Sequence, residues 1–446
     1  MKHALLITLG CKTNQYEGEM LLRGLREHGI LPADDGASPD LAVVNTCTVT
    51  MRADRKCRQA IRGIASRHPG VPIYVTGCYA GRDAKELSSL DGVAGVAAGK
   101  DELLRMIARN VHPSAAAAPP EPSPPSRRRA RAFLKIQDGC DAFCTYCIVP
   151  HVRPTLRSEP LEGILREAER LVRAGFREIV LTGIHLGRYG ADRPGGPALV
   201  EVVRRVASTA GLLRLRLSSI EMPEVADDLA ELIAQNPVLC PHLHLPLQSG
   251  DDGVLAAMNR RYAAADFLDT ARRLRRRIPS LSITTDVIVG FPGETEEAFE
   301  NTLRLAREVG FSKIHVFPYS VRPGTAAAKL PRRVPPRVVT ARKKRLLRLA
   351  DDLALDVKRR FLGKTVPVLV EESKPAPSGL LLSSGFTEYY LRVRFGAPAD
   401  LVDRLVHVVV ESVTPRVMEG RLAEPPQGSV TPAGQENRRE SSCSGG

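Results

Sequence analysis

The feature that most constrains this chain is a loop with three closely spaced cysteines, Cys140-Asp-Ala-Phe-Cys144-Thr-Tyr-Cys147. A cubane iron–sulfur cluster takes four ligands, so three cysteines leave one iron open to a substrate or a cofactor. The loop follows a strand-like run, Phe133–Gln137, and Gly139 lets the chain turn tightly before the first cysteine. The spacing therefore predicts a cluster with one open iron at the end of a strand.

A zinc knuckle is the alternative interpretation of the same loop. Zinc usually takes four protein ligands, and no fourth Cys or His stands at the spacing of a zinc ribbon or finger. His151 is the nearest candidate for a fourth ligand. The spacing therefore favours the iron–sulfur cluster over zinc.

The length and charge of the chain limit its architecture and its partners. A chain of 446 residues is too long for one ordinary core, which predicts two or three domains. The formal net charge of +14 favours a polyanionic partner. Nine cysteines, mostly within motifs, indicate metal ligands in a reducing compartment rather than disulfides. No apolar run has the length of a membrane span and the first residues lack a cleavage site, so we expect a cytoplasmic protein.

Short apolar runs alternate with amphipathic helical stretches up to about residue 112. This pattern is typical of a parallel sheet covered by helices. The predicted strands are His3–Leu9, Leu41–Thr46, Pro72–Thr76 and Val93–Ala97. The predicted helices are Asn14–His28, Met51–Ser66, Arg82–Ser89 and Asp101–Asn110.

The first three of these strands each end beside a cysteine, namely Cys11, Cys47 and Cys78. Parallel strands bring their carboxyl ends to one edge of the sheet, where open α/β sheets bind ligands. A single cysteine at a strand end is normally a small buried hydrophobic residue. Three at equivalent positions predict a second three-cysteine cluster with an open iron. Cys57 lies on a helix without such neighbours, and we expect it to be structural.

Four motifs together resemble those of the radical S-adenosylmethionine (SAM) methylthiotransferase family. They are Leu-Gly-Cys-Lys-Thr-Asn at 9–14, Asn-Thr-Cys-Thr-Val-Thr at 45–50, Val-Thr-Gly-Cys-Tyr at 75–79, and the Cys140 loop with Tyr146 before its last cysteine. The resemblance covers about residues 4 to 424. It implies a flavodoxin-like N-terminal domain, a radical SAM barrel and a small C-terminal β-barrel of the TRAM type. The Cys-Lys-x-Asn wording resembles the branch that modifies N6-threonylcarbamoyladenosine in tRNA, whereas the isopentenyladenosine branch more usually has Cys-Gln-x-Asn.

Six strand–helix repeats follow between about residues 132 and 330. The predicted strands are Phe133–Gln137, Arg177–Thr182, Leu213–Ser218, His242–Leu247, Ser282–Val289 and Lys313–Tyr319. The predicted helices include Pro160–Ala174, Ala198–Thr209, Val225–Gln235, Ala264–Arg276 and Glu294–Val309. Six repeats are fewer than the eight of a closed barrel, so we expect a (β/α)6 barrel that is open on one side.

Three of these strands alternate apolar and polar residues. The polar residues that share a face are His242, His244 and Gln248; Arg214, Arg216 and Ser218; and Ser282, Thr284 and Asp286. Helices must cover the apolar faces, so we expect the polar residues to face the lumen. A closed barrel usually fills its lumen with branched aliphatic side chains. A polar lumen instead predicts a cavity that holds a ligand.

The resemblance also implies which residues contact SAM. They are Tyr146, Thr182, Gly183, Ser218, Ser219, Glu221 and Gly290. Tyr146 and Gly290 are expected near the adenine, and the others near the methionine amino group or the ribose hydroxyls. Pro154 departs from the family pattern, which usually has glycine after the arginine at this position. The proline removes an amide donor and fixes φ.

The last third of the chain begins with a basic helical stretch. From Arg332 to Arg360 there are eleven Lys or Arg against three Asp or Glu, and Thr340–Phe361 has helical periodicity. Either a solvated helix packed on the barrel or a face that follows phosphates explains this charge. The residues expected to contact RNA in the second interpretation are Arg342, Lys343, Lys344 and Arg345.

Five short strands after residue 364 predict a small closed barrel. They are Val366–Val370, Leu380–Leu382, Tyr390–Phe395, Leu405–Val410 and Arg421–Ala423. Tyr390, Arg392 and Arg394 are expected on one exposed face, which suits base stacking and phosphate contact. The resemblance to a TRAM domain falls on the same segment.

These observations divide the chain into five segments. The expected boundaries are 1–112 for the N-terminal methylthiotransferase domain, 113–131 for a linker, 132–361 for the barrel with the basic helix, 362–425 for the TRAM-like domain and 426–446 for a disordered tail. Cys240 is expected to be structural, and Cys443 receives no role.

The resemblance implies an enzyme that adds a methylthio group to carbon-2 of N6-threonylcarbamoyladenosine at tRNA position 37. It implies SAM and two [4Fe–4S] clusters, one on Cys140, Cys144 and Cys147 and one on Cys11, Cys47 and Cys78. A radical is needed because no ordinary acid or base deprotonates an aromatic C–H near neutral pH. The expected partners are the tRNA anticodon loop, whose unstacked base can enter the lumen, an electron donor such as flavodoxin or ferredoxin, and a sulfur donor.

Three alternatives remain open at this point. The sibling methylthiotransferase acting on isopentenyladenosine in tRNA differs only in the wording of the first cysteine motifs. The sibling that modifies a ribosomal-protein aspartate has a basic protein as its substrate. An enzyme as basic as this chain is a poor electrostatic fit to such a substrate. A non-enzymatic RNA-binding iron–sulfur protein would have no purpose for a polar lumen.

Overall fold

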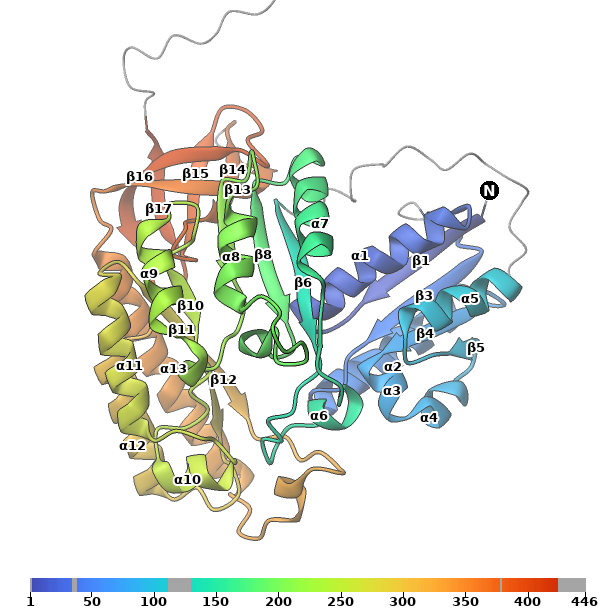
Figure 1. The fold of residues 1–446 in the computed structure, drawn as a ribbon, viewed down its shortest axis with the longest axis horizontal. Coiled ribbons are helices and arrows are strands. Elements are labelled where there is room, and N and C mark those ends of the chain that lie inside the picture. The colour runs from blue at the N-terminus through green and yellow to red at the C-terminus, as the bar shows by residue number, and fades with distance from the viewer. Residues whose placement is uncertain (1, 34–37, 111–129, 378, 424–446) are drawn as a thin grey trace, which may run out of the picture.

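The structure is a computed structural model, and it describes residues 2–33, 38–110, 130–377 and 379–423. Most of the predicted linker, the predicted tail and Cys443 lie outside these ranges. Three bodies are visible in Figure 1: an N-terminal sheet with helices, a central half-barrel and a small C-terminal barrel. None of the helices within the described ranges combines the length and the apolar character that crossing a membrane requires.

The N-terminal body is a five-stranded parallel sheet in the order β2-β1-β3-β4-β5. Its strands are β1 (Lys2–Thr8), β2 (Ile30–Pro32), β3 (Leu41–Thr46), β4 (Ile73–Gly77) and β5 (Val93–Val96). Its helices are α1 (Lys12–Glu27), α2 (Met51–Arg67), α3 (Cys78–Arg82), α4 (Ala84–Ser88) and α5 (Lys100–Asn110). The strand order is that of the flavodoxin-like fold, which confirms the predicted class. The sequence did not indicate β2, because this edge strand has only three residues and ends in proline.

The central body is the predicted barrel, open on one side. Its six parallel strands are β6 (Arg131–Asp138), β8 (Glu178–Gly183), β9 (Arg214–Leu217), β10 (His242–His244), β11 (Ser282–Val289) and β12 (Lys313–Pro318), with β7 (Arg157–Ser158) antiparallel at the edge. Its helices are α6 (Val149–Val152), α7 (Leu161–Arg173), α8 (Leu199–Ala207), α9 (Asp227–Gln235), α10 (Asp252–Ala257), α11 (Ala264–Arg277), α12 (Glu296–Val309) and α13 (Pro336–Arg359). Isolated bridges such as Ser219 to His244 connect β9 to β10. Strand β10 is shorter than predicted, because Pro246 has no N–H for a ladder.

Helix α1 packs against the half-barrel at β6 and β8. The Lys135 ammonium on β6 donates to Glu17 on α1 at 2.8 Å, and Arg23 pairs with Glu167 on α7 at 3.3 Å. Figure 1 shows α1 lying between the N-terminal sheet and β6. The first turn of α1, which follows Cys11, therefore lies against the barrel.

The C-terminal body is a closed barrel in the order β13-β14-β15-β17-β16, which confirms the predicted small barrel. Its strands are β13 (Thr365–Pro375), β14 (Leu381–Phe386), β15 (Arg392–Ala397), β16 (Leu405–Val413) and β17 (Met418–Leu422). Two buried arginines of β9 hold it to the half-barrel. Arg214 donates to the Phe386 carbonyl at 2.9 Å, and Arg216 donates to the Glu388 carbonyl at 2.7 Å.

Candidate functional site

The backbone of the Cys140 loop is held by hydrogen bonds within the loop and to residues outside it. The Cys140 N–H donates to the Arg153 carbonyl at 3.1 Å, and the Cys147 N–H donates to the Cys144 carbonyl at 2.9 Å. Asn259 donates from its amide to the carbonyls of residues 142 and 143. Gly139 has φ of 79°, and a side chain there would meet the Thr155 carbonyl oxygen at 2.0 Å. The turn that the sequence predicted before the first cysteine therefore requires glycine.

Two cationic side chains lie against the sulfurs of this loop. His185 Nδ1 is 3.5 Å from Cys140 Sγ, and Arg260 Nη1 is 3.7 Å from Cys144 Sγ. Burial lowers the pKa of His185, but hydrogen bonds to Cys140 and Glu224 outweigh it and raise that pKa to about 10. Burial raises the pKa of the Cys147 thiol to about 12. Positive groups beside the sulfurs favour the thiolates that a metal cluster needs.

The second set of cysteines stands at the carboxyl ends of three neighbouring strands, as the sequence predicted. Cys11 caps α1 after β1, Cys47 follows β3, and Cys78 is the first residue of α3 directly after β4. Two buried asparagines connect these strand ends. Asn14 donates to the Leu9 and Thr46 carbonyls, both at 2.8 Å, and Asn45 donates to the Asn14 carbonyl at 2.8 Å.

Close approach of the strand ends depends on two glycines with positive φ. Gly10 has φ of 113°, and a side chain there would lie 2.7 Å from Cys47 Cβ. Gly77 has φ of 95°, and a side chain there would lie 2.4 Å from the Thr46 carbonyl oxygen. Both motif glycines are therefore needed to bring the three cysteines to one edge of the sheet.

The thiols of the second set influence one another electrostatically. Burial, together with the neighbouring Cys78 and Cys11, raises the pKa of Cys47 to about 12. Cys57, which we expected to be structural, is buried and lies against the backbone of Cys47. Its Sγ donates to the Cys47 carbonyl at 3.3 Å and accepts from the Cys47 N–H at 3.4 Å.

The spacing of the sulfurs tests the zinc alternative. Zn–S bonds of about 2.3 Å place the ligand sulfurs of one tetrahedral ion within roughly 4 Å of one another. Among the described residues, neither cysteine set forms a group of ligand atoms that lie within 4.8 Å of one another. His151 is exposed, and its ring packs edge-on against Phe143 at 5.9 Å. Neither set is therefore arranged, among the described residues, as the closely spaced ligands of a single zinc ion.

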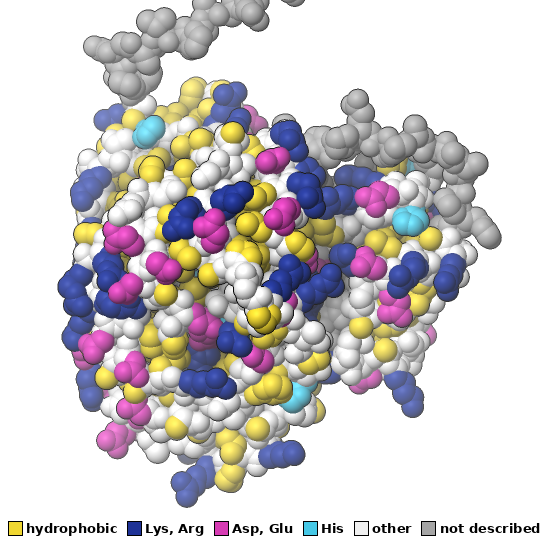
Figure 2. Space-filling view, in the orientation of Figure 1, with side chains coloured by type: hydrophobic (Ala, Val, Ile, Leu, Met, Phe, Trp, Pro, Cys, Tyr) yellow, Lys and Arg dark blue, Asp and Glu magenta, His cyan; other side chains and the backbone are white. Residues whose placement is uncertain are grey.

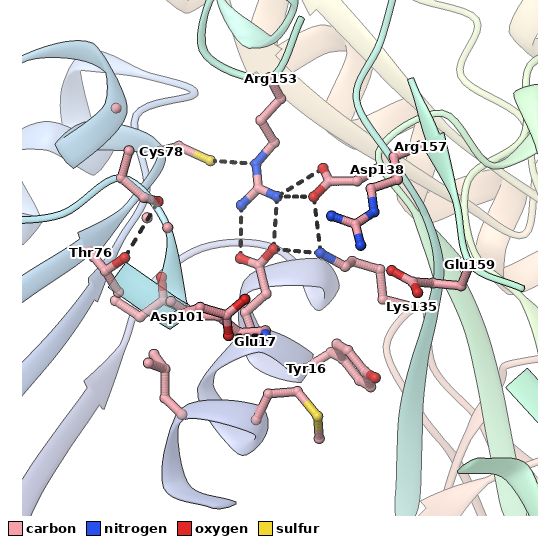
Figure 3. Close-up of a pocket in the computed structure, with 18 of the residues that line it drawn as sticks. Tyr16, Glu17, Thr76, Cys78, Asp101, Lys135, Asp138, Arg153, Arg157 and Glu159 are labelled. Atoms are coloured by element: carbon pink, nitrogen blue, oxygen red, sulfur yellow. Dashed lines mark hydrogen bonds and ion pairs between the residues drawn. The ribbon is translucent and has the colours of Figure 1, made fainter. Parts of the chain in front are cut away.

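Arg153 connects the two cysteine sites (Figure 3). Its carbonyl accepts from the Cys140 N–H, and its side-chain Nε donates to Cys78 Sγ at 3.2 Å. The guanidinium also donates to both carboxylate oxygens of Glu17, at 2.7 and 2.8 Å, and to Asp138 at 2.9 Å. These groups line a cavity of about 660 Å³ between α1, α3 and β6. The two sites are therefore tied to one another by a single residue of the barrel.

The residues expected to contact SAM differ in how well their surroundings suit a ligand beside the Cys140 loop. Ser218 is buried, and its hydroxyl has no hydrogen-bond partner among the described residues. Glu221 and Cys144 line a cavity of about 240 Å³. Arg260 holds both oxygens of Glu221, one of them at 3.0 Å. Tyr146 packs on an apolar cluster beside the loop.

The remaining SAM candidates differ from one another. Thr182 is buried on β8, Gly183 lies close to the Gln137 amide oxygen, and Ser219 is exposed. At Gly290, a side chain would meet Val339 of α13 at 2.4 Å, and the Gly290 N–H donates to Glu294 at 2.8 Å. The expected approach of Gly290 to the adenine stays a prediction.

The polar faces of β10 and β11 meet inside the half-barrel. His242 Nε2 and His244 Nδ1 lie 3.0 and 2.9 Å from the Thr284 hydroxyl. His244 Nε2 lies 3.4 Å from Asp286, and His315 of β12 completes a group of three with them. On β9, Arg214 and Arg216 donate to backbone carbonyls of the C-terminal barrel, and Arg216 also lies over the Tyr390 ring.

The residues expected to contact RNA also need correction. Arg342 is buried and donates to Glu294 at 2.7 Å, so it does not belong to a solvent-facing surface. Arg345 is half-exposed and pairs with Glu296 and Glu300. Lys344 is exposed and Lys343 is half-buried. Figure 2 shows basic and acidic side chains interspersed over the visible face rather than separated.

On the C-terminal barrel, Tyr390, Arg392 and Arg394 do not all lie on one exposed face as predicted. Arg392 and Arg394 are exposed on β15, beside Glu372 and Glu419. Tyr390 precedes β15 in a turn with φ of 62°, and its ring lies 5.0 Å from the ring of His242. Alternation along a strand does not apply to a residue in a turn, so Tyr390 faces the half-barrel and not the surface.

Three residues that contact the site have no signal of their own in a single sequence. His185, Arg260 and Lys12 are charged or ionisable side chains that the fold places beside the cysteines or in the lumen. Arg153 lies just beyond the Cys140 loop in the sequence, which predicts that it holds a carboxylate or a phosphate, and it does hold the Glu17 carboxylate.

Comparison with known proteins covers nearly the whole chain. Two family models match: the Radical SAM superfamily over residues 134–306 and Uncharacterized protein family UPF0004 over residues 3–99. The chain is 37% identical over 441 residues to threonylcarbamoyladenosine tRNA methylthiotransferase MtaB of Bacillus subtilis, covering 95% of this chain and 97% of that protein. It is 34% identical over 436 residues to tRNA-2-methylthio-N(6)-dimethylallyladenosine synthase of Syntrophobacter fumaroxidans, covering 94% and 95%.

A solved structure resembles the fold at low sequence identity. It is the radical S-adenosylmethionine methyltransferase TsrM from Kitasatospora setae, with cobalamin and a [4Fe–4S] cluster bound. The TM-score is 0.54 at 18% identity, over 73% of this chain and 77% of that one. This likeness is evidence for the fold alone.

Proposed function

Because the chain belongs to the radical SAM methylthiotransferase family, we propose that it adds a methylthio group to carbon-2 of N6-threonylcarbamoyladenosine at tRNA position 37. The observation that carries this proposal is similarity along 95% of the chain to a methylthiotransferase that is named for this nucleoside. The dimethylallyladenosine synthase is similar over almost the same length but at lower identity.

As a member of this family, the chain takes an iron–sulfur cluster and SAM in the half-barrel. Cys140, Cys144 and Cys147 supply the thiolates, and the unpartnered Ser218 hydroxyl and the Glu221 carboxylate offer polar contacts beside them. When bound, these groups supply the radical that removes the hydrogen atom from carbon-2. Arg260 fixes Glu221 in position, and His185 and Arg260 balance the charge of the thiolates.

The second cluster belongs to the proposal as well. Cys11, Cys47 and Cys78 stand at the carboxyl ends of three neighbouring parallel strands, which supports a cluster with an open position for the sulfur species. Arg153 stands between this site and the Cys140 loop. On this proposal, the sulfur species is held near the base whose carbon-2 receives the methylthio group.

The proposed partners follow from the same chemistry. The tRNA anticodon loop presents an unpaired base, and the exposed Lys344, Arg392 and Arg394 are candidates for phosphate contact. An electron donor such as flavodoxin or ferredoxin, a sulfur donor and a cytoplasmic location complete the proposal.

Mass spectrometry of tRNA nucleosides tests the function directly. The gene for this chain is deleted and then restored, and the methylthio nucleosides are measured in both strains. We expect the methylthio form of threonylcarbamoyladenosine to disappear and to return. If the methylthio-isopentenyl nucleoside responds instead, the sibling function is correct and the proposed substrate is wrong. If no tRNA nucleoside changes, tRNA is not the substrate.

A further inference from the structure

Lys12 places an unpaired ammonium group inside the half-barrel. It is the first residue of α1, and its Nζ lies 6.0 Å from the centroid of the Tyr390 ring. Lys12 has no hydrogen bond and no ion pair with any residue that the structure describes. A cation that is largely withdrawn from water is costly unless an anion accompanies it. The position therefore favours an anionic partner that the chain does not itself provide.

The other cations around Tyr390 already have such partners. Arg131 and Arg216 lie over the same ring, at 5.1 and 5.0 Å from its centroid. Arg131 pairs with Glu371, and Arg216 donates to the buried Glu178 at 2.8 Å. Among these three cations only Lys12 lacks a carboxylate of the described chain.

The opposite wall of the lumen offers hydrogen-bonding groups rather than a matching charge for Lys12. Asp286 acts on Lys12 electrostatically, but no ion pair joins the two. The half-buried His244, Asp286 and His315 lie together on this wall. Nδ1 of the buried His242 has no hydrogen-bond partner among the described residues. The lumen therefore presents a cation at one end and hydrogen-bonding groups, unsatisfied in part, at the other.

A metal ion on His244, Asp286 and His315 is the competing interpretation. Two imidazoles and one carboxylate are a known metal-ligand set. However, Lys313, Asp286, His244 and Lys12 all act electrostatically on His315, and Asp286 is the one anionic group among these four. Such surroundings oppose a divalent cation and favour a ligand that carries negative charge.

Resting on the proposed function, we propose that Lys12 determines specificity by binding the carboxylate of the threonylcarbamoyl group. That substituent carries one carboxylate, one hydroxyl and two N–H groups, which match the cation at one end of the lumen and the acceptors at the other. Lys12 directly follows Cys11, and carbon-2 must approach the Cys11 site to receive sulfur. On adenine, carbon-2 and the carbon that bears N6 flank the same ring nitrogen, so the substituent extends from the sulfur site into the lumen. An isopentenyl group has no charge to offer Lys12.

Binding of chemically matched RNAs tests the proposal without relying on turnover. We compare four anticodon stem–loops that differ only in the group on N6 of the target adenosine. These N6 groups are the threonylcarbamoyl group, the methyl ester of its carboxylate, an isopentenyl group, and no added group. Fluorescence anisotropy at one fixed salt concentration gives Kd for each RNA with the holoenzyme. The variants are Lys12→Gln and Lys12→Arg, with Lys56→Gln on the exposed face of α2 as the matched control.

The expected result is a coupling between Lys12 and the carboxylate. The unsubstituted enzyme binds the acid about thirtyfold or more tightly than the ester, as expected for a partly desolvated charge pair. Lys12→Gln binds acid and ester equally, Lys12→Arg retains the preference, and Lys56→Gln behaves as the unsubstituted enzyme. Iron content and circular dichroism of each variant verify that the fold is intact.

Two outcomes overturn the inference, and a third overturns the proposed function on which the inference rests. If the unsubstituted enzyme binds acid and ester equally but prefers both to unmodified RNA, the function stands and the role of Lys12 is wrong. If Lys12→Gln weakens acid and ester to the same extent, Lys12 contributes to folding or to phosphate contact only. If the enzyme prefers the isopentenyl RNA, the proposed function itself fails.

Discussion

The two three-cysteine sites differ in what brings their sulfurs together. Cys140, Cys144 and Cys147 lie within eight residues of one loop, and their spacing is fixed by local turns and by Asn259. Cys11, Cys47 and Cys78 are each more than thirty residues apart and meet only because three parallel strands end at one edge. The first site depends on a loop, and the second depends on the whole N-terminal sheet.

This difference predicts how each site fails. A defect near the loop should affect the loop alone, since its supports include exposed hydrogen bonds such as those from Asn259. A defect at a strand end should affect folding and cluster binding together, because the supports of the second site are buried backbone contacts.

The largest expected effect comes from removing one cysteine of each site. Cys140→Ala should abolish both the cleavage of SAM and the methylthio product. Cys47→Ala should abolish the product but leave SAM cleavage close to the unsubstituted rate, because SAM is held at the other site. Chromatography of 5′-deoxyadenosine and of the RNA nucleosides measures both reactions. Loss of SAM cleavage in Cys47→Ala would mean that the two sites are not functionally separate.

A smaller effect is expected from Gly77→Ala. The alanine would meet the Thr46 carbonyl at 2.4 Å in a backbone with φ of 95°, so we expect a destabilisation of at least about 2 kcal/mol and loss of iron from the second site. Gly29→Ala is the control, because Gly29 has φ of 72° with nothing within 4 Å and reports conformational strain alone. Chemical denaturation and iron analysis compare the two variants. Equal stability of both would contradict the role of Gly77 in strand approach.

The smallest effect distinguishes the two supporting asparagines. Asn45→Ala removes a buried donor to the Asn14 carbonyl and should cost about 1–3 kcal/mol, because the carbonyl is left unsatisfied. Asn259→Ala removes exposed hydrogen bonds and should cost about 0.5–1.5 kcal/mol. Urea unfolding gives the free energies, and iron analysis should show that each variant loses metal at its own site. The reverse order of stabilities would contradict the contrast between loop and sheet.

The sequence predicted the loop site and the fold classes because those signals are local or periodic. The spacing of Cys140, Cys144 and Cys147 needs no tertiary information, and strand alternation was enough to count six barrel strands. Convergence of Cys11, Cys47 and Cys78 was also predictable, since it follows from parallel topology alone.

What the sequence did not reveal are contacts between residues that are far apart in the chain. Arg342 belongs to a basic run, but Glu294 in the preceding helical region buries and pairs it. Tyr390 stands beside an alternating strand, yet a turn with positive φ directs it toward His242. The junction of Arg153 with Glu17 and Cys78 joins residues that are far apart in the chain. No local pattern encodes such pairings.

Iron analysis with Mössbauer spectroscopy tests most directly the claim that both sets of cysteines hold clusters. The unsubstituted chain is reconstituted beside two triple variants, one with Cys11, Cys47 and Cys78 changed to alanine and one with Cys140, Cys144 and Cys147 changed. We predict about eight iron ions per unsubstituted chain and about four in each variant, with the [4Fe–4S] signature in all three. About four iron ions in the unsubstituted chain, unchanged when the N-terminal cysteines are removed, would contradict the account.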